Sequence, residues 1–166
     1  MKKALVLLLL ICITVGVSAC SDAGEKQSVP SQESEEVQLN NEEAKPLYAK
    51  DIKDGTYNIT AECNASMFRV VNCDLIVENG EMQAVMTMSG QGFGMVYMGT
   101  AEEAQADSED KVIPAVLNEN GEKTFTVPVK ALNIGIDCAA LSVKRNTWYD
   151  HVLTFKSDSI PSQALK

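Results

Sequence analysis

Residues 73–88 read CDLIVENGEMQAVMTM, and this stretch decides the fold class. Apolar side chains alternate with polar ones on both sides of the dipeptide Asn79-Gly80, which is the preferred sequence of a two-residue hairpin turn. After this turn the apolar positions are 82, 84, 86 and 88, so they share one face of an extended chain. The stretch therefore predicts two antiparallel strands with one face toward a core.

Similar short alternating runs, separated by turn residues, continue on both sides of this hairpin. Residues 101–110 interrupt them with a short helical sequence that is rich in Ala, Glu and Gln. About seven strands with regular turn signals predict an all-β fold, an immunoglobulin-like antiparallel β-sandwich over residues 48–166. The Cys…Trp…Cys order of antibody domains is absent, because Trp148 follows every cysteine. The strand-like runs are 57–62, 72–78, 81–88, 95–98, 124–129, 134–140 and 147–155.

The N-terminus has the pattern of a secretory signal peptide. Lys2 and Lys3 precede an uncharged apolar run that ends at Val17, and small residues then lead to Cys20. The run is too short to span a bilayer, which needs about 20 apolar residues. The sequence Val-Ser-Ala-Cys at positions 17–20 resembles the lipobox of bacterial lipoproteins. This resemblance implies cleavage after residue 19, lipid on Cys20, and anchoring at the extracellular face of the cell membrane.

The segment from Cys20 to residue 47 differs in composition from the rest of the chain. It consists mainly of Ser, Gln, Glu, Asn and Ala, with very few branched apolar or aromatic residues. Such a segment cannot bury enough apolar surface to offset the entropy lost on ordering, so we expect a disordered acidic spacer. An acidic binding tail is the alternative.

The charge balance limits the partners. The signal peptide carries two of the 14 basic residues and no acidic residue, so the mature chain holds 12 basic and 23 acidic residues, a net charge of −11. Nucleic acid, which requires clusters of Lys and Arg, is not an expected partner. Docking of the folded domain on anionic lipid is also not expected, and the two acyl chains on Cys20 would hold the protein at the membrane.

Three cysteines remain in the domain, namely Cys63, Cys73 and Cys138. An odd number allows at most one disulfide bond. Cys63 and Cys73 are spaced for a bond between adjacent strands. The favoured alternative is three buried thiols that act as small hydrophobic side chains.

Several residue types suggest binding chemistry. Six methionines lie in the segment from Met67 to Met98. Their thioethers are soft ligands that could bind Cu(I) or haem iron. The alternative is that these side chains fill an irregular core. The glycine-rich segment 89–94 predicts a hairpin or binding loop beside an apolar surface. His151, the single histidine, has no partners for a catalytic triad and is expected to be partly buried at a sheet edge.

The sequence Ser66-Met67-Phe68 after a first strand, followed by the strand series, resembles the NEAT haem-binding modules of Gram-positive surfaces. That resemblance implies a short Ser-containing helix over haem and a tyrosine ligand in a Y-x-x-x-Y strand. This chain has no Y-x-x-x-Y and reads Trp-Tyr-Asp-His at 148–151, where Tyr149 is one of the candidate ligand-binding residues. Residues 50–160 also resemble clostridial surface lipoproteins.

Together these observations predict a non-catalytic surface module that captures haem or an iron compound for uptake, with an ABC transporter or another surface protein as partner. The alternative is a protein-interaction or envelope-structural module without a small ligand. An enzyme is not expected, because no set of nucleophile, base and acid can be assembled. Besides the lipidation site Cys20, the candidate ligand-binding residues are Ser66, Met67, Phe68, Met86, Met88, Phe93, Tyr97, Met98 and Tyr149.

Overall fold

The computed structural model describes residues 45–107 and 109–166. The predicted signal peptide, Cys20 and all of the predicted spacer up to residue 44 lie outside the described residues. The last spacer residues are described and contact the domain: Leu47 forms a β-bridge with Leu132, and the carbonyl oxygen of Lys45 accepts a hydrogen bond from Asn133 Nδ2 at 3.0 Å. Among the described residues, no helix has the length and apolar character needed to cross a bilayer.

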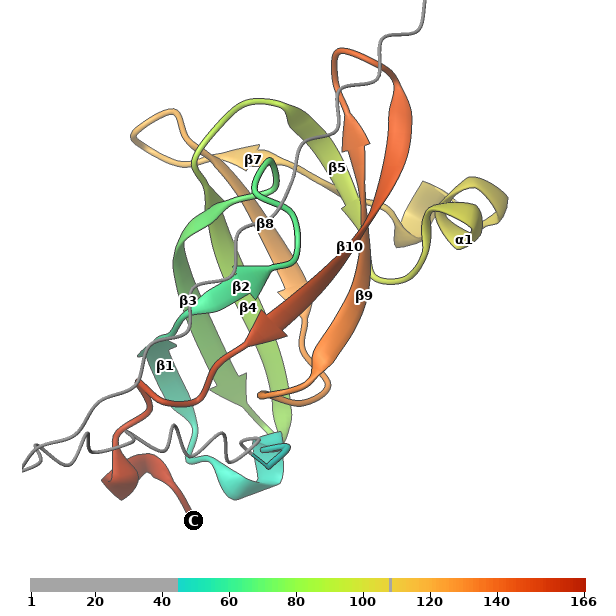
Figure 1. The fold of residues 1–166 in the computed structure, drawn as a ribbon. Helices are drawn as coiled ribbons and strands as arrows, with labels where there is room; N and C mark the ends of the chain where they lie inside the picture. Colours follow the sequence, from blue (N-terminus) through green and yellow to red (C-terminus); the bar gives the residue numbers. More distant parts are fainter. Residues whose placement is uncertain (1–44, 108) are drawn as a thin grey trace, which may run out of the picture. The chain divides into compact units, whose positions relative to one another are not determined.

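Two five-stranded antiparallel sheets pack face to face (Figure 1). This arrangement confirms the predicted all-β sandwich. The first sheet has the order β1 (Gly55–Asn58), β3 (Val70–Glu78), β4 (Glu81–Met88), β8 (Lys123–Pro128) and β7 (Val116–Leu117). The second has the order β2 (Ala61–Cys63), β10 (Thr147–Phe155), β9 (Gly135–Ser142), β5 (Phe93–Tyr97) and β6 (Ile113–Pro114). The short helices are η1 (Ala49–Asp51), α1 (Ala101–Ala106), η2 (Glu109–Lys111) and η3 (Ser162–Ala164).

The hairpin at residues 73–88 forms as the sequence predicts. Glu78 pairs with Glu81 across the turn, and Asn79 and Gly80 have φ values of 54° and 81°. Both values are positive, as a type I′ turn requires. The register places the alternating apolar residues of β3 and β4 on one face, where they form one half of the core.

The core lies between the two sheets and contains methionines and phenylalanines. The sequence pattern of β4 is confirmed as a core-facing pattern, since Met82, Met86 and Met88 are buried. Unbranched methionine side chains fill the irregular space between twisted sheets. The largest fully buried side chains are those of Phe68, Phe125, Phe155, Ile52, Leu75, Met86, Leu132 and Leu153.

The described residues form ten strands rather than about seven. The run 57–62, expected as one strand, is divided: β1 pairs with β3 in the first sheet and β2 pairs with β10 in the second. The chain changes sheets between them, where Ile59 N donates to the carbonyl oxygen of Cys73 and Thr60 accepts from Lys156 N. The chain changes sheets again between β6, in the second sheet, and β7, in the first. Each of these strands has two residues, which is too short for an alternating pattern to be visible in the sequence.

The predicted helical segment is confirmed as α1. Thr100 caps it: Glu103 N donates to Thr100 Oγ1 at 3.2 Å, and Thr100 N donates to Glu103 Oε2 at 2.8 Å. This reciprocal pair is a capping box, which satisfies two backbone donors at the start of the helix. Ala101 N also donates to Asp150 Oδ1 at 2.6 Å, so the helix is fastened to β10.

Candidate functional site

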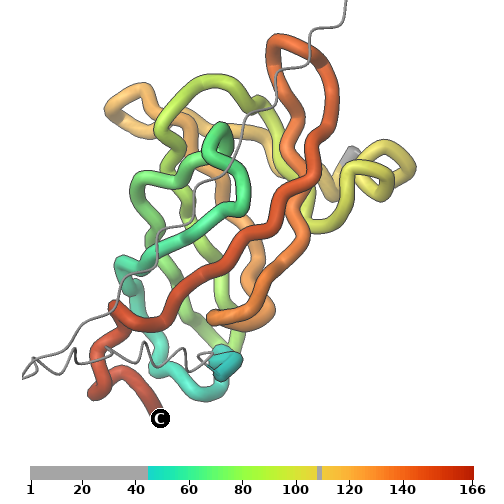
Figure 2. The backbone as a smooth tube through the Cα atoms, viewed as in Figure 1, coloured from blue at the N-terminus to red at the C-terminus, as the bar shows by residue number. Residues whose placement is uncertain are grey.

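A cavity of about 520 Å³ lies between the β2–β3 loop and the β9–β10 hairpin. Figure 2 shows these two segments at the same end of the sandwich, with the hairpin projecting beyond the sheets. Each wall comes from a different part of the sequence, so only the folded chain forms the cavity. Its lining residues are Asn64, Ala65, Ser66, Met67, Phe93, Ser142, Arg145, Tyr149, Asp150 and His151.

Asn64 and Phe68 fix the two ends of the loop that forms one wall. Asn64 N donates to the carbonyl oxygen of Val152 at 3.1 Å, and Val152 N donates to Asn64 Oδ1 at 3.0 Å. Phe68 is completely buried, and its N donates to the carbonyl oxygen of Ala65 at 3.2 Å. Between these anchors the side chain of Met67 is 85% exposed. The loop therefore presents a flexible apolar side chain over the cavity while its ends stay on the core.

Aromatic rings surround His151 at the base of the cavity. Phe68 is stacked on the imidazole with ring centroids 4.9 Å apart and an interplanar angle of 23°. Phe93 meets the imidazole edge-on, with centroids 5.7 Å apart. Because side chains alternate along β10, His151 faces inward together with Leu153 and Phe155.

His151 is only 6% exposed, and neither ring nitrogen has a hydrogen-bond partner among the described residues. Burial lowers the pKa of the imidazole, and the nearby carboxylate of Asp150 opposes this effect only in part. The ring is therefore neutral at neutral pH. The expected partial burial is wrong, because the imidazole is buried. Strand β10 lies between β2 and β9, but its pairing with β2 covers only residues 153–155, and His151 itself pairs only with Cys138 of β9.

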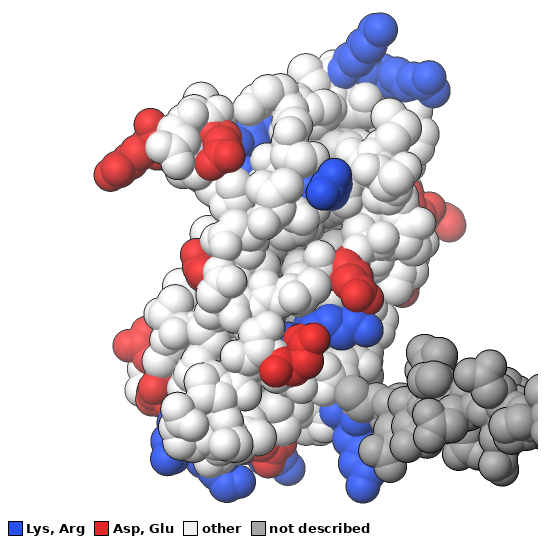
Figure 3. Space-filling view, turned by 60° about the vertical axis from the view of Figure 1, so that its left-hand side comes forward, with Lys and Arg blue, Asp and Glu red and all other residues white. Residues whose placement is uncertain are grey.

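The rim of the cavity is polar, and its charged lining residues are the cationic Arg145 and the acidic Asp150. Arg145 Nη1 donates to the hydroxyl oxygen of Tyr149 at 3.2 Å, and Ser142 lies beside them in the lining. The exposed guanidinium can pair with a carboxylate of a ligand. Over the face seen in Figure 3, acidic and basic side chains are scattered among uncharged ones.

The structure brings four of the candidate residues to the cavity, namely Ser66, Met67, Phe93 and Tyr149, with Phe68 packed directly behind them. The short helix that the NEAT resemblance implies does not form between β2 and β3, where Ser66 and Met67 form only a hydrogen-bonded turn. Sequence reasoning missed the roles of Asn64 and Arg145 and gave His151 little weight. Single polar residues in alternating strands carry no local pattern that would have identified them.

The other candidate residues lie away from this cavity. Met86 is completely buried, and Met88, 6% exposed, borders only a neighbouring hollow of about 30 Å³. Tyr97 donates its hydroxyl to Asp107 Oδ2 at 2.7 Å, and Met98 packs partly buried against the core. Within the described part of the chain, no group of three or more His, Cys, Asp or Glu residues is arranged to hold a metal ion.

The three cysteines of the domain are free thiols; Cys73 and Cys138 are buried, as favoured from the sequence, whereas Cys63 is only partly buried. Cys63 lies in β2 and Cys73 in β3, so the alternative bond between them does not form. Burial raises the pKa of both Cys73 and Cys138 to about 12. These thiols therefore remain protonated and behave as small apolar side chains.

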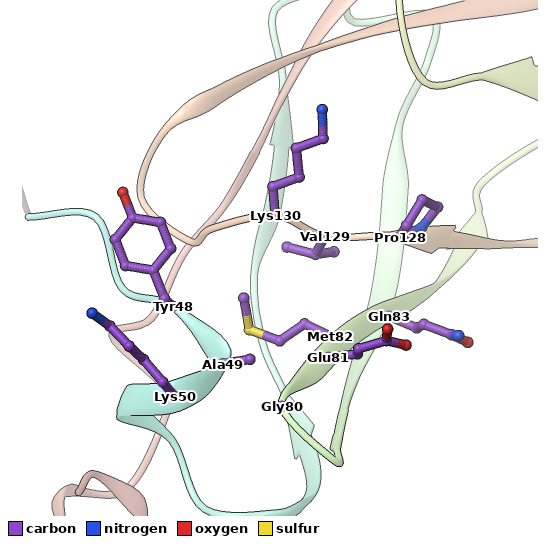
Figure 4. A pocket seen from close by; sticks show the side chains of 10 residues that line it. All are labelled: Tyr48, Ala49, Lys50, Gly80, Glu81, Met82, Gln83, Pro128, Val129 and Lys130. Carbon is purple, nitrogen blue, oxygen red and sulfur yellow. The ribbon is translucent and has the colours of Figure 1, made fainter.

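A second cavity, of about 670 Å³, lies at the opposite end of the sandwich, where η1, the β3–β4 turn and the segment after β8 meet. Figure 4 shows Met82 reaching from β4 into this space between Ala49 and Val129, while the ends of Lys50 and Lys130 extend outward. Its lining holds no buried polar group without a partner, among the residues described. Nothing in its chemistry distinguishes a particular ligand.

No family model matches the chain, and no curated protein shows significant sequence similarity to it.

Proposed function

We propose that this chain is a membrane-anchored extracellular lipoprotein whose domain captures haem or an iron compound without catalysis. The binding site is the cavity between the β2–β3 loop and the β9–β10 hairpin. One observation carries the proposal: the fold brings Ser66, Met67, Phe93 and Tyr149 together around one cavity, and these residues were selected as binding candidates from the sequence. Its immunoglobulin-like character and its kinship with NEAT modules are part of the same proposal.

The chemistry of the cavity fits haem. Haem has a flat apolar ring with carboxylates at one edge, and Met67 and Phe93 supply apolar surface beside the cationic group of Arg145. The phenol of Tyr149 and the imidazole of His151 are an oxygen donor and a nitrogen donor that protein-bound iron accepts. The orphaned nitrogens of His151 are an additional argument, because a buried polar group without a partner costs about 1–3 kcal/mol.

The residues around the cavity have different roles in the proposed binding. Arg145 attracts and orients an anionic group at the rim, and its hydrogen bond to Tyr149 holds the phenol beside the opening. Met67 covers the apolar face of the ligand, and the buried Phe68 keeps the loop in place. When bound, haem supplies an iron that accepts axial ligands from the protein. Lipid on Cys20 would keep the module at the cell surface, where an ABC transporter or another surface protein receives the ligand.

A second candidate function is a protein-interaction or envelope-structural module. It is favoured by Val116 and Leu117 in strand β7 at the edge of the first sheet, whose side chains are 64% and 61% exposed. Unpaired strand edges with exposed apolar residues invite pairing with another chain. This candidate predicts a partner recovered by crosslinking on intact cells.

Titration of the mature chain with hemin tests the proposed function. We expect the Soret band to shift on binding, and Tyr149→Phe to raise the dissociation constant about tenfold, since about 1.4 kcal/mol from one lost polar contact corresponds to that factor. Tyr97→Phe is the matched control, because its hydroxyl bonds to Asp107 outside the cavity, and it should bind like the wild type. A wild-type spectrum identical to that of free hemin would contradict the proposal.

A further inference from the structure

His151 combines features that a purely structural residue does not need. It is the single histidine in the sequence, it lines the cavity of about 520 Å³, and it is 6% exposed. Both its ring nitrogens lack a hydrogen-bond partner among the residues described. Buried polar groups in folded proteins are nearly always satisfied, and an exception calls for a functional explanation.

The immediate surroundings cannot satisfy the ring. Phe68 and Phe93 contact it with aromatic carbon, and neither offers an acceptor or a donor of ordinary strength. Cys138 is the residue opposite His151 in the β9–β10 ladder, and its thiol is directed to the carbonyl oxygen of Ala139 at 3.7 Å. A leucine or phenylalanine would suit this apolar environment better than histidine. The imidazole is therefore retained at the expense of stability.

Geometry limits what β10 can offer to one iron atom. Tyr149 and His151 are two positions apart on β10, so they project from the same face of the strand. Two side chains from one face of a strand would approach a bound iron from the same side, so β10 would offer it a single ligand. The loop residues Ser66 and Met67 bound the cavity from another part of the chain.

We propose that His151 is the residue of β10 that ligates the iron of the captured compound through a ring nitrogen, while Tyr149 and Arg145 bind the periphery. This inference rests on the proposed function. The hydroxyl of Tyr149 already accepts a hydrogen bond from Arg145 at 3.2 Å, whereas neither ring nitrogen of His151 has a hydrogen-bond partner among the described residues. A neutral imidazole has a lone pair available for iron.

Access to the nitrogen requires a small movement. Both nitrogen atoms are covered in the structure, and residues 65–67 form the opposite wall of the cavity. Met67 is 85% exposed and so contributes little packing that would resist a displacement of this turn. Asn64 and Phe68 hold the ends of the loop, so the sheets need not change.

The test uses the mature chain, the variant His151→Leu and hemin as the probe. Leucine has about the volume of histidine and no polar atom, so we expect a melting temperature higher by about 3–6 °C, because the orphaned polar group is gone. The same variant should bind hemin at least about 100-fold more weakly, a loss of about 2.7 kcal/mol. Residual complex should lose the absorption and resonance Raman bands of imidazole-ligated iron. A His151→Leu variant that is more stable but has lost iron ligation would identify His151 as an iron ligand, because removing a structural residue would lower stability.

Two further variants make the test specific. Tyr149→Phe should weaken binding and keep the imidazole-type spectrum, because it leaves the ligating nitrogen in place. His151→Ala should recover the wild-type spectrum when free imidazole is added, since the truncated side chain leaves space for it. If His151→Leu fails to fold, this rescue by imidazole still tests whether His151 ligates the iron.

The outcomes separate the two proposals. If the wild-type chain does not bind hemin, the proposed function and this inference are both overturned. If the wild-type chain binds hemin and His151→Leu leaves affinity and spectrum unchanged, only the assignment of His151 is overturned. A tyrosinate-type spectrum that disappears in Tyr149→Phe would likewise overturn it and retain the proposed function.

Discussion

Replacing Phe68 with alanine is expected to lower the free energy of unfolding by about 3–5 kcal/mol, the usual cost of removing a buried phenylalanine. Its ring is completely buried, 5.2 Å from that of Phe93, 6.4 Å from that of Phe125 and 4.9 Å from that of His151, measured between ring centroids. Truncation leaves a cavity at the point where the β2–β3 loop meets both sheets. Urea denaturation followed by tryptophan fluorescence measures the change.

The adjacent residue supplies the control for this experiment. Met67 precedes Phe68 in the chain but is 85% exposed, so Met67→Ala should change the free energy of unfolding by no more than about 0.5 kcal/mol. Equal losses from the two variants would show that Phe68 is not the anchor of the loop. Hemin affinity should fall in both variants, since Met67 covers the cavity and Phe68 positions it.

Replacing Cys20 with alanine should abolish membrane anchoring. In the proposed lipoprotein the thiol of Cys20 is the group that accepts lipid, and the apolar run before it is shorter than the roughly 20 residues of a spanning helix. Fractionation of cells followed by immunoblotting should find an unprocessed precursor or soluble protein in place of a membrane-bound product.

Cys63→Ala is the matched control for the fractionation experiment. This cysteine is a free thiol within strand β2, and its removal should leave the protein in the membrane fraction. Membrane-bound Cys20→Ala protein of mature size would mean that another segment anchors the chain and that the lipobox interpretation is wrong.

Local sequence patterns predicted the elements whose partners are close in the chain. The β3–β4 hairpin has its two strands and its turn within residues 70–88, so alternation and the Asn79-Gly80 dipeptide were sufficient. The helix α1 likewise follows from a local composition and the Thr100 cap. The change of sheet between β1 and β2 was not predictable, because it depends on pairing with Cys73 and Lys156, which are distant in sequence.

The candidate site shows the same limit. Alternation indicates that His151 faces inward with Leu153, but it cannot show that Phe68 and Phe93 cover the ring, and this is why the burial of His151 was underestimated. The shared face of Met86 and Met88 was visible in the sequence, yet that face belongs to the core. The cavity of about 520 Å³ depends on the meeting of the β2–β3 loop and the β9–β10 hairpin, which no local pattern encodes.

The central claim is that this cavity holds an iron compound, and locating the iron tests it most directly. Crystals of the mature chain grown with hemin, measured at the iron absorption edge, should give one strong anomalous peak in the cavity bounded by Met67, Phe93 and His151. A peak elsewhere on the protein, or no ordered iron at saturating hemin, would contradict the account.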